Sequence, residues 1–271
     1  MTPERAHPAL PDALDLAAAI VDARARAGHL FVGLDFDGTL TPIVSRPELA
    51  HLGGDTRLVL VRLAARPDTV VAVLSGRALA DVRTRVAVPG LFFAGNHGFE
   101  IEGPGISELH PAADAAAPAI RRLAEACARQ LARIEGVIVE DKGVTLSVHF
   151  RLVAERAHAD VRAAVRALVA GEAGVRMSEG KMVIEVRPDV AWDKGAALAF
   201  LRRALHDDPA APALFIGDDR TDEDAFRELG PGGWGILVAE QPPAQTAARA
   251  RLRDPGAVQA LLERLARMEA R

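Results

Sequence analysis

The stretch that decides the fold is residues 30–40, which read LFVGLDFDGTL. Its first half is an apolar run of the length expected for a strand buried on both faces. Its second half carries the carboxylates Asp35 and Asp37, followed by Gly38, which permits a sharp backbone turn. We therefore expect a buried strand that delivers two acids to one edge of a sheet.

Further short apolar runs recur along the chain, separated by helix-sized segments. They lie at residues 70–74, 91–94, 213–216 and 234–238, and helices are expected at about 12–27 and 55–65. Short apolar runs that alternate with helices are typical of a parallel sheet covered on both faces. The sequence predicts an α/β fold with a doubly wound parallel sheet.

Polar residues follow these runs where each expected strand ends. Besides Asp35, they include Ser75, the pair Asn96 and His97, and the pair Asp218 and Asp219. Ligands of open α/β sheets bind beyond the carboxyl ends of the strands. We expect these side chains to meet at a single site.

The middle of the chain departs from the alternation of short apolar runs and helices. Helices are expected at 117–134 and 154–170, strands at 137–140, 144–151, 175–177 and 181–187, and hairpin turns at 141–143 and 178–180. This pattern predicts an α+β cap domain at residues 111–187, inserted into a catalytic core of residues 1–110 and 188–271.

Alternate residues of two cap strands are polar. Thr145, Ser147, His149 and Arg151 share one face of the first strand, and Lys181, Glu185 and Arg187 share one face of the last, with the apolar Val183 among them. Two interpretations stay open for this surface. It is either a solvated sheet face or a face that looks onto the strand-end residues and grips a polar ligand.

The acids at the strand ends suggest phosphoryl chemistry. A carboxylate such as Asp35 can attack phosphorus and form an acyl phosphate that water later cleaves. Asp37 can donate a proton to the leaving oxygen and later accept one from the attacking water. Carboxylates so close to a phosphate need a cation, and oxygen ligands, with Asp218 as the further acid, select a hard ion such as Mg²⁺.

Phosphoryl transfer also requires donors on the phosphate oxygens. Ser75, within the sequence Ser-Gly-Arg, is expected at a strand end, and Lys194 is expected at the start of a helix where the chain leaves the cap. Each of these short motifs is weak alone. Their order around Asp35 and Asp218 makes the set informative.

Composition excludes several classes of function. The chain has 271 residues and a net charge of −4, so it shows no basic surface for nucleic acid. A single cysteine allows no intrachain disulfide, and no apolar window is long enough to span a bilayer. The start of the chain lacks the pattern of a signal peptide. We expect a cytoplasmic protein whose partner is a small molecule, without nucleic acid or membrane.

The motifs together resemble the trehalose-6-phosphate phosphatase family of the haloacid dehalogenase superfamily. They lie at residues 35–40, 75–77, 95–98, 180–181 with 185–188, 193–195 and 217–222, within a resemblance that spans about residues 30–238. The core motifs are typical of the superfamily. The turn around His97 and the run from Lys181 to Pro188 are similar to the trehalose branch.

The resemblance implies a role for each matching residue. Asp35 would be the nucleophile and Asp37 the general acid and base, while Ser75 and Lys194 hold the phosphate. Mg²⁺ would be held by the Asp35 carboxylate, the Asp37 backbone carbonyl and Asp218, supported by Asp219 and Asp222. Lys181 and Glu185 would bind glucose hydroxyls, and the further candidates for substrate contact are Arg77, His97, His149 and Arg151. The activity implied is hydrolysis of trehalose 6-phosphate.

Other functions remain possible on these motifs. The core motifs are shared by other sugar-phosphate phosphatases and by phosphomannomutases of the same superfamily. A non-enzymatic phospho-acceptor, similar to a response-regulator receiver, also combines acids, a hydroxyl and a lysine on an α/β sheet. Asp37 and the cap argue against the receiver, and the intact catalytic positions argue against an inactive sugar-phosphate sensor.

Overall fold

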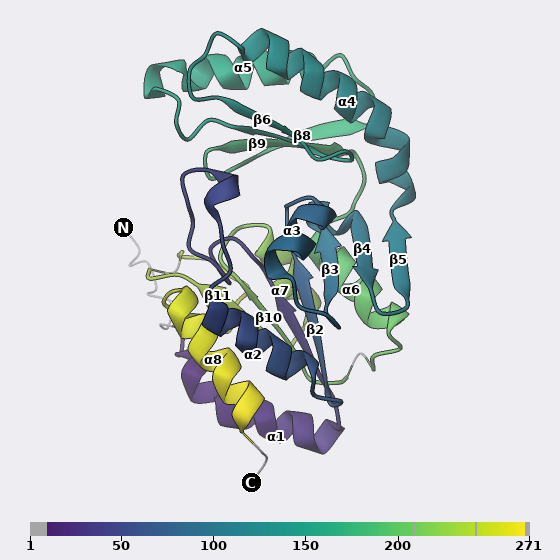
Figure 1. Cartoon of the computed structure of the whole chain (residues 1–271), viewed down its shortest axis with the longest axis vertical. Helices are drawn as coiled ribbons and strands as arrows, with labels where there is room; N and C mark the ends of the chain where they lie inside the picture. Colours follow the sequence, from purple (N-terminus) through teal and green to yellow (C-terminus); the bar gives the residue numbers. More distant parts are fainter. Residues whose placement is uncertain (1–9, 209, 242, 269–271) are drawn as a thin grey trace, which may run out of the picture.

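The computed structural model describes residues 10–208, 210–241 and 243–268. Figure 1 shows two sheets stacked along the long axis of the molecule, the larger with helices on both faces and the smaller beneath two helices. Within the described part of the chain, no helix combines the length and the apolar character needed to cross a membrane.

The larger sheet has the strand order β12-β11-β10-β1-β2-β3-β4-β5. Its strands are β1 (Leu30–Leu34), β2 (Thr69–Leu74), β3 (Phe92–Gly95), β4 (Glu100–Gly103), β5 (Ile106–Leu109), β10 (Ala213–Gly217), β11 (Trp234–Val238) and β12 (Ala250–Leu252). The strands from β12 to β3 pair in parallel, and β4 and β5 are added in antiparallel fashion. The predicted α/β class with a mostly parallel sheet is confirmed.

Helices cover both faces of this sheet because its strands are apolar on both sides. One face packs against α1 (Ala17–Ala27), α2 (Gly54–Ala64), α3 (Leu79–Val86) and α8 (Pro255–Arg267), and the other against α6 (Lys194–Ala204) and α7 (Asp222–Glu228). On β1, Leu30, Val32 and Leu34 face the first group of helices, whereas Phe31 faces the second. All five residues of β1 are buried, which fixes the strand that carries Asp35.

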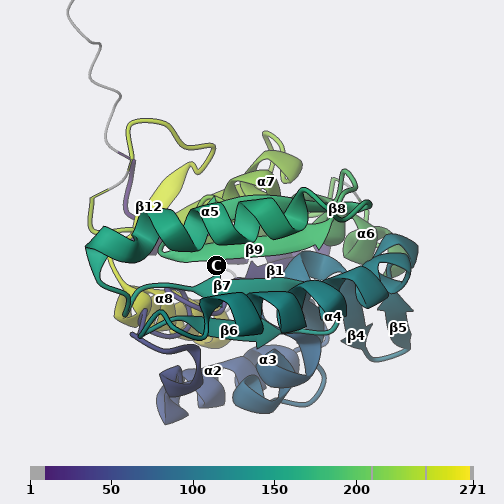
Figure 2. The ribbon, with the colours of Figure 1, turned by 90° about the horizontal axis from the view of Figure 1, so that it is seen from above.

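The smaller sheet is antiparallel and has the order β6-β7-β9-β8. Its strands are β6 (Ile138–Asp141), β7 (Leu146–His149), β8 (Val175–Gly180) and β9 (Val183–Pro188), and its helices are α4 (Pro111–Leu131) and α5 (His158–Val169). Figure 2 shows both helices lying across one face of this sheet, where they share an apolar core. We call this sheet and its two helices the cap; its other face is turned toward the larger sheet (Figure 1).

The turn between β8 and β9 differs from the prediction. The expected turn at residues 178–180 is wrong, because the strand ladder continues to a pair between Gly180 and Val183. The chain reverses at Lys181 and Met182, and Met182 has a φ of 65°. Lys181 therefore lies at the tip of the hairpin and not within the strand.

Candidate active site

The polar residues at the carboxyl ends of β1, β2, β3 and β10 meet beneath the cap. A cavity of about 210 Å³ is lined there by Asp35, Asp37, Ser75, Lys194 and Asp218 of the larger sheet and its connections. The same cavity is lined from the cap by His149, Arg151, Lys181 and Glu185. Residues from distant parts of the sequence thus line one cavity, as the strand-end rule predicts.

Lys194 is a buried cation of the cavity. It begins α6, whose first turn is capped by Asp193, and its Nζ lies 2.7 Å from Asp35 Oδ1 and 2.6 Å from Asp222 Oδ1. Burial alone would lower the pKa of Lys194, but the charges of Asp222 and Asp35 raise it well above its ordinary value. A permanently charged ammonium beside Asp35 can neutralise a phosphate oxygen.

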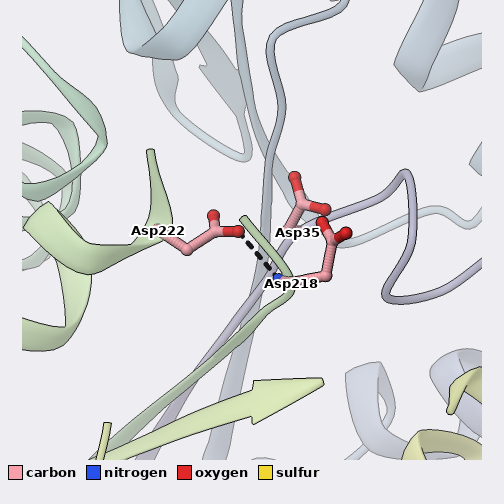
Figure 3. A group of neighbouring side chains, drawn as sticks. All are labelled: Asp35, Asp218 and Asp222. Carbon is pink, nitrogen blue, oxygen red and sulfur yellow. Dashed lines mark hydrogen bonds between the residues drawn. The ribbon is translucent and has the colours of Figure 1, made fainter. Parts of the chain in front are cut away.

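Three carboxylates form an acidic cluster beside this lysine. Asp35, Asp218 and Asp222 each offer an oxygen within 4.8 Å of the others, and Figure 3 shows them converging from the ends of β1 and β10 and from the start of α7. Burial is the largest cause that raises the pKa of all three carboxyl groups, and the pKa of Asp222 rises to about 7. Carboxylates that are buried together in this way suit a hard divalent cation, which would offset their charge.

The backbone supports the same cluster. Asp222 Oδ2 accepts hydrogen bonds from the backbone N–H groups of Asp218 at 2.9 Å and Asp219 at 3.0 Å, the first drawn in Figure 3. Asp219 turns its own carboxylate to Thr221, whose N–H and hydroxyl donate to it. Gly38 has a φ of 87°, and a Cβ there would lie 2.3 Å from Asp218 Oδ2. Only glycine therefore allows the loop after β1 to approach the loop after β10 so closely.

Asp37 is held by Arg77. The guanidinium donates from Nε to Asp37 Oδ2 at 2.6 Å and from Nη2 to Asp37 Oδ1 at 2.7 Å. This bidentate pair fixes the plane of the carboxylate. Arg77 also donates to Asp81 and to the Pro47 carbonyl. In this geometry Arg77 fixes the Asp37 carboxylate, and its predicted contact with substrate stays a prediction.

The turn after β3 is held in an unusual backbone conformation. Asn96 and His97 have φ values of 50° and 58°, which lie in the left-handed region that non-glycine residues seldom adopt. The Asn96 N–H donates to the Arg77 carbonyl, and the His97 N–H donates to the Ser75 carbonyl at 2.9 Å. The two turns are thereby locked together, and the His97 ring packs so tightly on Gly76 that a Cβ there would lie 2.7 Å from it.

The cap contacts the larger sheet through charged side chains. Glu185 Oε1 lies 2.8 Å from His97 Nε2, and Lys181 Nζ lies 3.2 Å from Asp218 Oδ2. Burial alone would raise the pKa of Glu185, but the charges of His97 and Lys142 and the His97 hydrogen bond hold it well below its ordinary value. Glu185 is therefore an ionised acceptor inside the cavity.

The two remaining cap candidates lie at the wall of the cavity. His149 Nε2 is 2.8 Å from Glu140 Oε2, and Arg151 donates Nη2 to the Lys181 carbonyl at 3.0 Å. Ser147, from the same face of β7, also lines the cavity, while Leu146 and Val148 point into the cap core. Of the two interpretations of this face, the geometry agrees with the one in which it looks onto the strand-end residues.

Sequence reasoning missed two residues of the site. Lys142, in the turn between β6 and β7, donates Nζ to the Gly76 carbonyl at 2.6 Å and lies 4.0 Å from Glu185 Oε1. Glu140, on β6, lines the cavity and is held by His149. The signal lies in the charged residues around the turn at 141–143, whose pattern by itself indicates only a hairpin connection.

The mostly parallel sheet with its α+β cap shares its fold with a haloacid dehalogenase-like hydrolase from Bacteroides thetaiotaomicron, at 16% identity and a TM-score of 0.60 over 88% of this chain and 99% of that one. In this chain the acidic cluster and the buried lysine lie at the strand ends of that fold. Comparison with known families narrows this class of hydrolases. Residues 33–256 match the model of the trehalose-phosphatase family, which covers most of the chain. The chain belongs to the trehalose-phosphatase family.

Individual relatives agree with this assignment. The trehalose-phosphate phosphatase of Mycobacterium tuberculosis (strain ATCC 25618 / H37Rv) is 41% identical, over 98% of this chain and 68% of that protein. The solved trehalose-6-phosphate phosphatase of Aspergillus fumigatus (crystal form 3) is 30% identical with a TM-score of 0.65, over 95% of this chain and 99% of that one. The C-terminal domain of the Candida albicans trehalose-6-phosphate phosphatase is 24% identical with a TM-score of 0.77, over 97% of this chain and 99% of that one. At this identity the similarity supports the fold alone.

Proposed function

We propose that this chain is a Mg²⁺-dependent phosphatase that hydrolyses trehalose 6-phosphate to trehalose and phosphate through a phosphorylated Asp35. The observation that carries the proposal is the shared cavity, in which Asp35 and Lys194 lie below Glu185 and Lys181 of the cap. The lower residues suit a phosphate, and the upper residues supply both acceptors and donors for sugar hydroxyls. The proposal agrees with the names of the relatives described above.

In the first step, an oxygen of Asp35 attacks phosphorus while the bond between phosphorus and the sugar oxygen breaks. Lys194 donates to Asp35 Oδ1, so the other oxygen, Oδ2, is the one we assign to the attack. The leaving sugar oxygen takes a proton from Asp37. Lys194 and the Ser75 hydroxyl, which lie on the same cavity, stabilise the charge on the transferring phosphoryl group.

In the second step, water attacks the phosphorus of the acyl phosphate and Asp37 accepts its proton. Phosphate leaves and the Asp35 carboxylate is restored. Both oxygens of Asp37 accept from Arg77 in this structure, and each oxygen keeps a second lone pair that can carry the transferred proton. Arg77 thus holds the Asp37 carboxyl group in place for the proton transfer.

The residues present fit a divalent cation. Asp35 and Asp218 supply carboxylate oxygens, the backbone carbonyl of Asp37 is the further ligand we propose, and Asp222 orients the loop that carries Asp218. A site made only of oxygen ligands favours a hard cation, and Mg²⁺ is the one we assign. When bound, the ion neutralises the phosphate and orients it toward Asp35.

The experiment that tests the proposed function is phosphate release from a panel of substrates with Mg²⁺ present. The panel contains trehalose 6-phosphate, sucrose 6-phosphate, glucose 6-phosphate, mannose 6-phosphate and para-nitrophenyl phosphate. We expect kcat/KM for trehalose 6-phosphate to exceed every other by roughly tenfold or more, the result of about 1.4 kcal/mol of additional contacts. An equal or higher value for another sugar phosphate would move the assignment to the other phosphatases of the superfamily.

A substitution in the cap separates sugar recognition from chemistry. If Glu185 accepts a hydrogen bond from a glucose hydroxyl, Glu185→Ala should lower kcat/KM for trehalose 6-phosphate by roughly 10- to 150-fold, the cost of a lost charged hydrogen bond. The ratio of this value to kcat/KM for para-nitrophenyl phosphate should fall by nearly as much. Both constants are measured by phosphate release on the purified variant.

Glu172→Ala is the matched control for Glu185→Ala. It removes the same group from the cap surface, where Glu172 pairs with Arg122 outside the cavity. We expect it to leave the substrate ratio as in the wild type. An equal loss on both substrates with a lower melting temperature, or no loss on either, would remove Glu185 from the sugar site.

A further inference from the structure

Ile43 is an exposed apolar side chain at the centre of a polar site. It lies in the loop of residues 41–50 that follows the catalytic strand, and it is 50% exposed. It lines the cavity that holds Asp35 and also the two larger cavities of about 760 and 620 Å³ that adjoin it. All three spaces share Lys181 and Asp218, so Ile43 stands where they join.

The cap presents two apolar residues to the same cavity. Met182 and Val183, at the tip of the β8–β9 hairpin, line the cavity together with Ile43. The tip is fixed in place, because Lys181 Nζ contacts Asp218 and the Met182 carbonyl accepts from the Phe150 N–H at 3.0 Å. Met182 also keeps a φ of 65° that a side chain of its size disfavours.

A pyranose ring carries hydroxyls at its edge and apolar C–H groups on its faces. Proteins usually cover such apolar groups with hydrophobic or aromatic side chains while a few polar groups bind the hydroxyls. No Phe or Trp lines any of the three joined cavities in the part of the chain that the structure describes, and the sequence contains no Tyr. Apart from the imidazole rings of His97 and His149, which are held by Glu185 and Glu140, the side chains that can supply the apolar contact are therefore aliphatic.

We propose that Ile43 determines substrate specificity by packing against the C–H face of a pyranose ring, with Met182 and Val183 across the cavity. The inference rests on the proposed function in one respect, namely that the substrate is a sugar phosphate. Covering Ile43 removes apolar surface from water, which favours binding of the sugar and leaves the phosphate contacts unaltered. The strained backbone conformation of Met182 is then the energetic cost of placing Met182 and Val183 against the ring from the cap.

The test compares a sugar phosphate with acetyl phosphate, which has no ring. For Ile43→Ser we expect the ratio of kcat/KM for trehalose 6-phosphate to that for acetyl phosphate to fall roughly tenfold, the scale of a lost apolar contact in a binding pocket. Ile43→Val should recover most of this ratio, because it keeps a branched apolar surface. Met182→Gly, which suits the positive φ, should lower the ratio in the same direction.

Leu49→Ser is the matched control. Leu49 lies in the same loop and is 51% exposed, yet it lines none of the three cavities. We expect its ratio to equal that of the wild type. A ratio that is unchanged in Ile43→Ser overturns the inference, whatever Met182→Gly shows and whether the two rates fall together or not at all. The proposed function is judged separately, on the substrate preference of the wild type.

Discussion

Asp35→Asn is expected to lower the rate of phosphate release by roughly 10⁴-fold or more, the scale at which loss of a nucleophile acts. The amide keeps the size of the carboxyl group but is a poor nucleophile and a weak ligand for a cation. The substitution should not unfold the protein. Burial raises the pKa of Asp35 well above its ordinary value, so the ionised carboxylate is disfavoured there, and Lys194 keeps Asp222 as a partner.

The measurement is phosphate release from trehalose 6-phosphate, alongside the melting temperature of each variant. Asp55→Asn serves as the control, because it makes the same chemical change at an exposed position in the first turn of α2. We expect the control to match the wild type and Asp35→Asn to melt at or above the wild-type temperature. Activity of Asp35→Asn within tenfold of the wild type would contradict the covalent mechanism.

The strands that carry the site could be predicted because their burial leaves a local signature. Residues 30–34 and 213–217 are buried on both faces, so they appear in the sequence as unbroken apolar runs. The parallel topology then brings their carboxyl ends together without any further information. This is why Asp35 and Asp218 could be placed at one site from the sequence.

The edge of the sheet could not be predicted in the same way. β4 and β5 read EIEG and ISEL, and most of their residues are at least partly exposed. Strands of this kind form because β3 offers a free edge, which is a tertiary effect that propensity does not contain. The same reasoning explains the shifted hairpin, since Gly180 marks a turn locally but pairs with Val183 in the fold.

The missing partners of the site lie far along the chain. Arg77 and Asp37 are 40 residues apart, and Lys142 reaches the carbonyl of Gly76 across 66 residues. Neither contact follows from a local pattern, because each depends on how two loops meet. Sequence reasoning therefore named Arg77 as a candidate for substrate contact but did not predict that its guanidinium holds the Asp37 carboxylate.

Removal of divalent cations should abolish phosphate release by the enzyme, and added Mg²⁺ should restore this activity. The cluster of Asp35, Asp218 and Asp222 concentrates negative charge where a phosphate must bind, and Lys194 and Lys181 only partly offset it. An ion that supplies several kcal/mol of charge stabilisation accounts for a loss of roughly 10³-fold on its removal. The measurement is phosphate release in excess chelator, followed by titration with Mg²⁺. Ca²⁺ should restore less activity, because it is larger and prefers more ligands.

Melting temperature provides the readout of binding that is independent of activity. A cation that binds only the folded protein stabilises it, so Mg²⁺ should raise the melting temperature of the chelator-treated wild type. Asp218→Asn should lose this rise, because it replaces one of the converging carboxylates with a neutral amide, which is a weak ligand for a cation. Asp224→Asn makes the same change on α7 outside that group of ligand atoms and should retain the rise. Unchanged phosphate release in excess chelator, or an equal rise in both variants, would contradict a cation held by this cluster and would leave Lys194 as the main counter-charge to the phosphate.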